Sequence, residues 1–272
     1  MTASAPTPVF ASHRWADWRT TDFAGLDPAR TVAVLPLGAT EQHGPHLSLS
    51  VDTVLVDGVV EAALAQLSPQ DPVLVLPTLP VGLSTEHTAF AGTLSLSPQT
   101  TLQLWLELAA SVARSGVKKL LLFNAHGGHV GLMDVAAREM RGQFGLTVFG
   151  SSWYQLPLGE ALAAFSEHEQ RFGAHAGAVE TAMMLALAPE RVDMSQARDF
   201  ASASQARAER YPLLGDGRSA KLGWHMQDYN PAGAAGHASS ATAAQGQALV
   251  RAAGNQLALL LKELVDFAPL SA

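Results

Sequence analysis

Residues 31–46 read TVAVLPLGATEQHGPH, a run of apolar residues that leads directly into a polar segment with glycine and histidine. Residues 31–37 carry no charge and are mostly aliphatic. A short apolar run of this kind, bounded by Pro or Gly, is typical of a parallel strand that is buried on both faces. The stretch therefore predicts a buried strand that ends where the polar segment begins.

Similar runs recur along the chain, separated by segments with the apolar spacing of helices. Further strands are expected at residues 73–76 (VLVL), 119–123 (KLLLF) and 146–149 (LTVF). Helices are expected at residues 53–67, 98–115, 130–144, 179–188 and 241–267, the second with Ser97 as N-cap and Pro98 at its first position. This alternation predicts an α/β fold, in which helices cover both faces of a mainly parallel sheet.

The composition and net charge exclude some classes of protein and partner. The 272 residues are 48% hydrophobic and only 15% charged, against a typical charged share of about 25%. We expect one domain over residues 1–272, with a core at about 30–265 and an irregular excursion at about 195–236, over the site or into a subunit contact. The net charge of -7 argues against nucleic acid or an acidic membrane surface as a partner.

Two absences in the sequence narrow the possibilities further. There is no cysteine, which excludes disulfides, thiolate metal sites and thiol nucleophiles, so a metal must be held by His, Asp and Glu. Residues 1–20 do not read as a signal peptide, and no run approaches the roughly 18 to 20 apolar residues that span a bilayer. A cytoplasmic protein without membrane contact is expected.

The first candidate site follows the strand at residues 31–37. Glu41 and His43 project to the same side if the backbone is extended, and Asp52 at the start of the next helix can return to them. Two carboxylates and an imidazole beside glycines suit a divalent metal. The alternative is a polar turn in which Asp52 only caps a helix.

The second candidate is the turn after the strand at residues 119–123. Residues 124–129 (NAHGGH) place His126 and His129 between this strand and the next helix. A loop that cradles phosphate is the alternative, because glycines and a helix N-terminus favour anions. The spacing matches neither G-x-G-x-x-G nor a P-loop with its lysine. Histidine chemistry is therefore favoured over nucleotide binding.

The third candidate is Glu180, in residues 175–187 (HAGAVETAMMLAL). It lies near the start of an otherwise apolar helix, where a buried carboxylate without a partner would be expensive. A metal or a histidine would serve as that partner. The alternative is an exposed Glu that complements the helix dipole.

Taken together, these segments resemble the creatininase (creatinine amidohydrolase) family. The resemblance implies a three-layer α/β/α sandwich, two divalent metal ions and hydrolysis of a non-peptide C–N bond, commonly in a cyclic amide, by a protein that is often a hexamer. Sequence leaves zinc, manganese and iron(II) open as the metal. The matching segments are residues 37–47 with Asp52, residues 90–96, residues 124–129 and residues 175–181.

Carried over residue by residue, the resemblance implies that Glu41, His43, Asp52 and His126 are metal ligands. Asp52 takes the place of the carboxylate that bridges the two ions. Creatininase has His-Tyr-Glu after its third strand, and that Glu is a ligand, whereas this chain has Gly128 there. Glu180, a ligand or catalytic base, is the nearest candidate to replace it.

The resemblance also assigns catalytic and substrate roles. His175 matches the substrate-site histidine and is expected to stabilise the tetrahedral oxyanion and to relay a proton to the leaving nitrogen. Trp153 matches an aromatic residue of the substrate pocket. Beside the resemblance, two interpretations are open for His87, His129 and Glu86: they shape that pocket, or they are solvated loop residues. The Trp-Asp pair of creatininase is missing, since residues 171–174 read RFGA.

The sequence thus supports a two-metal amidohydrolase that acts on a small cyclic or N-substituted amide through a metal-bridging hydroxide. One alternative is a family member specialised on another C–N substrate, such as a formamide-bearing pyrimidine or a modified peptide end. Another is a metal-stabilised binding protein without turnover. The small-molecule amide is the expected partner, together with further copies of the chain in a homo-oligomer.

Overall fold

The computed structural model describes residues 12–271. Most of the N-terminal segment on which the expectation about a signal peptide rests therefore lies outside the described residues. The central sheet has four parallel strands in the order β2-β1-β3-β4, which confirms the four strands expected from the sequence. The strands are β1 (Val32–Leu37), β2 (Val73–Val75), β3 (Lys119–Asn124) and β4 (Thr147–Ser152).

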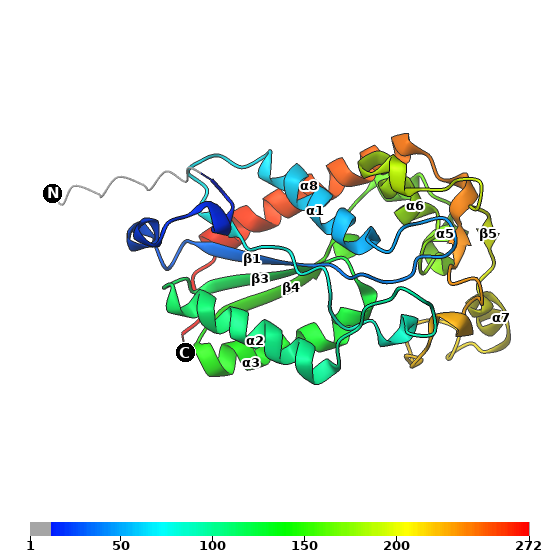
Figure 1. Cartoon of the computed structure of the whole chain (residues 1–272), viewed down its shortest axis with the longest axis horizontal. Coiled ribbons are helices and arrows are strands. Elements are labelled where there is room, and N and C mark those ends of the chain that lie inside the picture. The colour runs from blue at the N-terminus through cyan, green and yellow to red at the C-terminus, as the bar shows by residue number, and fades with distance from the viewer. Residues whose placement is uncertain (1–11, 272) are drawn as a thin grey trace.

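Helices cover both faces of this sheet, so the three-layer α/β/α architecture is confirmed (Figure 1). One outer layer consists of α1 (Val51–Leu64), α6 (Ala178–Leu187) and α8 (Ala243–Asp266). The other consists of α2 (Pro98–Arg114) and α3 (Val130–Phe144). Each of the five helices expected from the sequence is present, with ends shifted by a few residues at most.

The strands are apolar throughout because each contributes to two cores. Val32 and Val34 pack with α1, α6 and α8, whereas Ala33 and Leu35 belong to the core that contains α2 and α3. Successive side chains of a strand point to opposite faces, and both faces of this sheet are covered. Continuous apolar runs follow from that burial.

Local signals set several helix ends. Ser97 accepts a hydrogen bond from Thr100 N at 3.1 Å, which confirms it as the N-cap of α2. Thr242 and Gln245 form a capping box at the start of α8. Helix α3 ends at Gly145, whose φ of 66° is the left-handed conformation that glycine adopts without strain.

Several of the smaller elements gather at one end of the molecule (Figure 1). The segment 195–236, expected to be irregular, contains α7 (Ala203–Arg210) and β5 (Asp199–Phe200), which pairs antiparallel with β6 (Gly236–His237). Helices α4 (Glu160–Ala163) and α5 (Glu167–Phe172) were not expected. Short 3-10 helices span Trp15–Asp17, Thr20–Gly25, Thr85–His87, Gly127–His129, Trp153–Gln155, Pro189–Arg191, Met226–Asp228 and Ala238–Ser240.

The strand order places a crevice at one edge of the sheet. From β1 the chain crosses through α1 to β2 on one side, and from β3 it crosses through α3 to β4 on the other. Neighbouring strands whose connections leave in opposite directions form the switch point at which open α/β sheets bind ligands. The carboxyl ends of β1 and β3 are therefore the expected place for a site.

No helix within residues 12–271 is both long enough and apolar enough to cross a membrane. The organisation of the whole chain as one domain stays a prediction.

Candidate metal centre

The loops that follow β1 and β3 meet at this crevice. Leu37 pairs with Asn124 in the last register position of the two strands, and Ala125 N donates to Leu37 O at 3.0 Å. Glu41 and His126 follow these strand ends by a few residues. The parallel register thus delivers two side chains from distant parts of the sequence to the same edge of the sheet.

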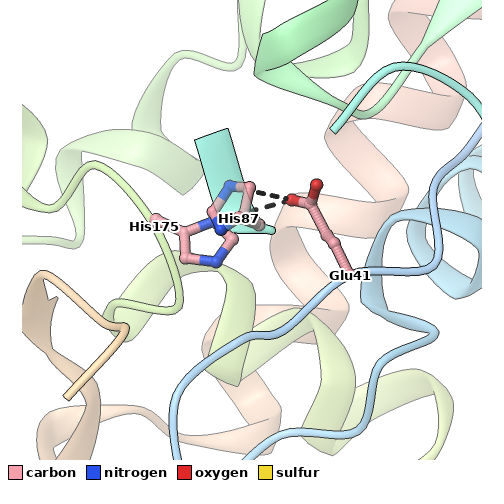
Figure 2. A group of neighbouring side chains, drawn as sticks. All are labelled: Glu41, His87 and His175. Carbon is pink, nitrogen blue, oxygen red and sulfur yellow. Dashed lines mark ion pairs between the residues drawn. The ribbon is translucent and has the colours of Figure 1, made fainter. Parts of the chain in front are cut away.

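Glu41 is buried at the centre of a group of imidazoles. Its Oε1 lies 3.2 Å from His126 Nδ1, 3.4 Å from His87 Nε2 and 4.0 Å from both His43 Nε2 and His175 Nδ1. Figure 2 shows the rings of His87 and His175 beside this carboxylate. One carboxylate thus contacts or approaches four histidine rings.

Asp52 joins two of these rings from the first turn of α1. Its Oδ1 lies 3.5 Å from His43 Nε2, and its Oδ2 lies 3.3 Å from His126 Nδ1. The side chain is buried, and its carboxylate faces the rings rather than the free N–H groups of the helix. Asp52 is therefore placed between two imidazoles, as a shared ligand would be.

Hydrogen bonds to backbone carbonyls fix the orientation of three rings. His43 Nδ1 donates to Glu41 O at 3.0 Å, His126 Nε2 to Leu83 O at 2.7 Å, and His175 Nε2 to Gln42 O at 2.7 Å. In each ring the other nitrogen then keeps its lone pair and faces the carboxylates. This is the outer-shell pattern that prepares histidines to bind a metal.

Three buried polar atoms of the cluster have no hydrogen-bond partner among residues 12–271. They are Glu41 Oε2, His43 Nε2 and Asp52 Oδ2. Buried polar atoms are normally paired. Carboxylate oxygens and imidazole nitrogens are the donors that zinc, manganese and iron(II) accept. The residues present therefore fit a divalent metal.

The electrostatics of the cluster also favour a cation. Burial alone would lower the pKa of His43, but the close carboxylates of Asp52, Glu180 and Glu41 raise it to about 9. Burial alone would raise the pKa of Asp52, yet His126 and His43 hold it well below its usual range. The carboxylates retain a positive neighbour, and a metal ion can take the place of the histidine protons.

Glu180 approaches the same cluster from α6. Ligand atoms of Glu180, His43 and His175 lie within 4.8 Å of one another. Glu180 Oε2 accepts a hydrogen bond from Ala176 N at 2.5 Å, and burial raises the pKa of the carboxyl to about 7. Ala176 has a φ of 52°, a strained conformation for a residue with a Cβ. The strained turn between His175 and Glu180 delivers both side chains to the site.

A cavity of about 450 Å³ opens onto the cluster. Its lining includes Glu41, Asp52 and His126 together with aromatic and aliphatic side chains. The walls contain Trp153, expected from the sequence, together with Tyr154, Leu158, Leu162 and Trp224. A mostly apolar cavity with a few convergent polar groups is typical of a small-molecule site.

The two further histidines expected in the substrate pocket have different surroundings. His87 lines the cavity, and its Nδ1 lies 2.8 Å from Gln42 Nε2. His129 does not line the cavity. Its Nε2 accepts from Leu83 N at 3.1 Å and its Nδ1 donates to Asn124 Oδ1 at 3.1 Å, so both nitrogens are already paired. His129 lies behind His126 and supports the loops rather than the substrate.

Several residues of the site carried no role in the sequence analysis. Gln42 Oε1 accepts from Gly44 N at 3.0 Å, which turns Nε2 toward His87 and His175. The motif that contains Gln42 was a usable signal. Trp224 lies in the aperiodic segment 195–236, where no pattern marked it. Only packing of that segment across the cavity brings it to the site.

The pH dependence of folding offers a test of this arrangement through His46. Burial, with His43 nearby, lowers the pKa of His46 to about 4, from 6.5 in an unfolded chain. Below pH 6.5 His46 binds a proton in the unfolded state but not in the folded state. The free energy of unfolding therefore falls as the pH drops from 6.5 to 4. We expect the free energy of unfolding of His46→Gln to depend less steeply on pH in this range, by the equivalent of up to about one proton. The measurement is urea unfolding of protein from which a chelator has removed the metal.

The exposed His168→Gln variant is the control for that measurement. Parallel curves for the His46→Gln variant and the unmodified protein would contradict the buried, neutral state of His46.

Comparisons with known proteins agree on one family. A family model described as "Creatininase: Creatinine amidohydrolase" matches residues 16–261. The chain is 33% identical over 224 residues to a mycofactocin precursor peptide peptidase of Mycobacterium ulcerans (strain Agy99), covering 79% of this chain and 78% of that protein. It is 30% identical over 196 residues to a creatinine amidohydrolase of Pseudomonas putida, covering 67% and 74%.

Solved structures show the same fold. A mutant creatininase described as Zn-Zn type superposes with a TM-score of 0.71 at 24% identity, covering 93% of this chain and 98% of that one. A structure described as creatininase Mn has a TM-score of 0.68, with the same identity and coverage.

Proposed function

Because the chain belongs to the creatininase family and is a hydrolase of C–N bonds, we propose that it is an amidohydrolase that uses two divalent metal ions. The observation that carries this proposal is the buried carboxylate of Asp52 between His43 and His126, where Glu41 Oε2, His43 Nε2 and Asp52 Oδ2 lack hydrogen-bond partners within residues 12–271. One ion would be held by Glu41, Asp52 and His126, and the other by His43, Asp52 and Glu180. Zinc and manganese are the candidates, with iron possible.

Two bound divalent ions supply a water of lowered pKa and polarise the amide carbonyl. The chain's own groups hold and move the protons. His175 Nε2 is engaged by Gln42 O, so its free Nδ1 is an acceptor that faces the cluster. Burial and the neighbouring imidazoles of His43 and His87 hold the pKa of His175 well below its usual value. The free lone pair of Nδ1 lets His175 accept a proton transiently, and its lowered pKa favours release of that proton to the leaving nitrogen. The oxyanion role expected from the sequence would need a protonated ring.

The remaining walls orient the substrate. Trp153 and the aliphatic side chains of Leu158 and Leu162 offer an apolar surface in the cavity that the metal-site residues also line. Such a surface keeps water from the reacting amide and strengthens the electrostatic interactions within the site. A small cyclic or N-substituted amide matches this combination of an apolar surface and metal-site residues.

A second candidate substrate is an amide bond in a peptide. The cavity volume of about 450 Å³ leaves room for more than one small ring, and it lies within the roughly 300 to 1,000 Å³ that drug-sized ligands occupy. Relatives named as precursor peptide peptidases support this alternative. A cytoplasmic location and assembly into a homo-oligomer, a hexamer by family resemblance, stay predictions.

The experiment is a hydrolysis assay of the purified chain with zinc and manganese supplied separately. The panel contains creatinine, other cyclic amides, a formamide-bearing pyrimidine and short peptides. We expect turnover of one class, loss of that turnover after chelation, and recovery after addition of zinc or manganese. Hydrolysis of none of them by protein with bound metal would contradict the proposal and support the binding protein without turnover.

A further inference from the structure

Position 128 is a glycine for a reason that lies outside its own loop. A Cβ built on Gly128 would overlap with Glu86 Oε1 and lie 2.5 Å from His126 Nε2. A Cβ built on the adjacent Gly127 would have no neighbouring atom of residues 12–271 within 4 Å. The loop therefore has room for a side chain at Gly127. At Gly128 the same space is occupied by the carboxylate of Glu86, which comes from a different segment.

Glu86 reaches that place from the 3-10 helix Thr85–His87. Its side chain is buried, and its Oε1 lies 3.5 Å from His126 Nε2, the ring nitrogen that donates to Leu83 O. Ligand atoms of Glu41, Glu86 and His126 lie within 4.8 Å of one another. Within residues 12–271 no lysine or arginine forms an ion pair with Glu86. Its ion-pair partner is the His126 imidazole, so a proton on that ring or a metal ion must compensate the buried charge.

Glu180, the replacement expected from the sequence, lies elsewhere in the cluster. It groups with His43 and His175, whereas Glu86 groups with Glu41 and His126. The two carboxylates thus approach different parts of the centre. Their places in the cluster therefore do not coincide.

We infer that Glu86 supplies, from the loop before α2, the metal-site carboxylate that the chain lacks at Gly128. The carboxylate of Glu86 lies where a side chain at position 128 would begin. Gly128 is then required, because any side chain there displaces Glu86. The inference rests on the proposed metal-dependent function and adds a residue to it.

Charge balance agrees with this assignment. Glu41, Asp52, Glu86 and Glu180 are four carboxylates around neutral imidazoles. When ionised, they carry the charge that two divalent cations neutralise. Glu86 thus adds one of the negative charges that face the two cations.

The first test compares Glu86→Gln with Glu139→Gln, a control on the exposed surface of α3. Metal content and zinc affinity are measured by competition with a chelator, and the ligand set by the absorption spectrum of cobalt(II)-loaded protein. We expect Glu86→Gln to weaken the binding of one ion by roughly 10- to 100-fold or more and to change the cobalt spectrum. The control should bind as the unmodified protein does.

The second test uses position 128 itself. Gly128→Ala should weaken metal binding as Glu86→Gln does, whereas Gly127→Ala should not. The double variant Glu86→Ala/Gly128→Glu should recover the ion that Glu86→Ala loses. Failure to recover it, in protein with a native circular dichroism spectrum, overturns the claim that both positions serve one carboxylate site.

These outcomes separate the inference from the function on which it rests. If the unmodified chain binds no divalent ion, the proposed function itself fails. If it binds two ions and Glu86→Gln leaves the zinc affinity and the cobalt spectrum unchanged, the proposed function stands and the role of Glu86 is overturned.

Discussion

Replacing Asp52 with alanine is expected to release both metal ions and to lower kcat on the order of a thousandfold or more. Asp52 is the carboxylate that contacts both His43 and His126, so its loss affects both halves of the centre. A metal ion contributes several kcal/mol of transition-state stabilisation. Each step of about 1.4 kcal/mol corresponds to a factor of ten in rate. The metal content is measured by elemental analysis, and kcat with the substrate found in the panel.

The control for this experiment is Asp57→Ala on the same helix. Asp57 Oδ1 accepts a hydrogen bond from Thr78 Oγ1 and does not line the cavity. This variant should keep both ions. Release of only one ion from Asp52→Ala would show that Asp52 is not shared between them, and retention of both would contradict its role as a ligand.

Replacing Lys119 with methionine is expected to lower the free energy of unfolding by about 3 to 5 kcal/mol. Lys119 begins β3 and is 1% exposed. Its Nζ donates to Leu264 O at 2.6 Å, Val265 O at 2.9 Å and Phe267 O at 3.1 Å. These carbonyls lie at the C-terminus of α8, where a positive charge is favoured and free carbonyls need partners. Methionine fills the space but leaves them unpaired.

The neighbouring Lys118→Met variant is the matched control, because Lys118 is exposed. Urea unfolding of the two variants measures the difference, and the cost for Lys118→Met should stay within about 0.5 kcal/mol. Equal midpoints for the two variants would show that the three hydrogen bonds of Lys119 contribute no stability.

Much of the metal centre could be predicted because its ligands follow regular elements directly. Glu41 and His126 come just after buried strands, and parallel strands end at a common edge. Asp52 opens a helix that returns to that edge. The direction of a side chain within a tight turn is not encoded in this way. His126 and His129 both follow β3, yet one faces the carboxylates and the other is paired with Asn124 and Leu83.

The sequence by itself determined the parallel sheet, the helices on its two faces and the carboxylates and imidazoles at its carboxyl edge. It could do so because periodicity and burial are properties of single segments. Only the tertiary structure decided why Lys119 is buried, why Gly128 lacks a side chain and that Trp224 lines the cavity. Each of these depends on an atom from a distant segment, the carbonyls of α8 for Lys119 and the carboxylate of Glu86 for Gly128. Such contacts arise from packing, which no local pattern records.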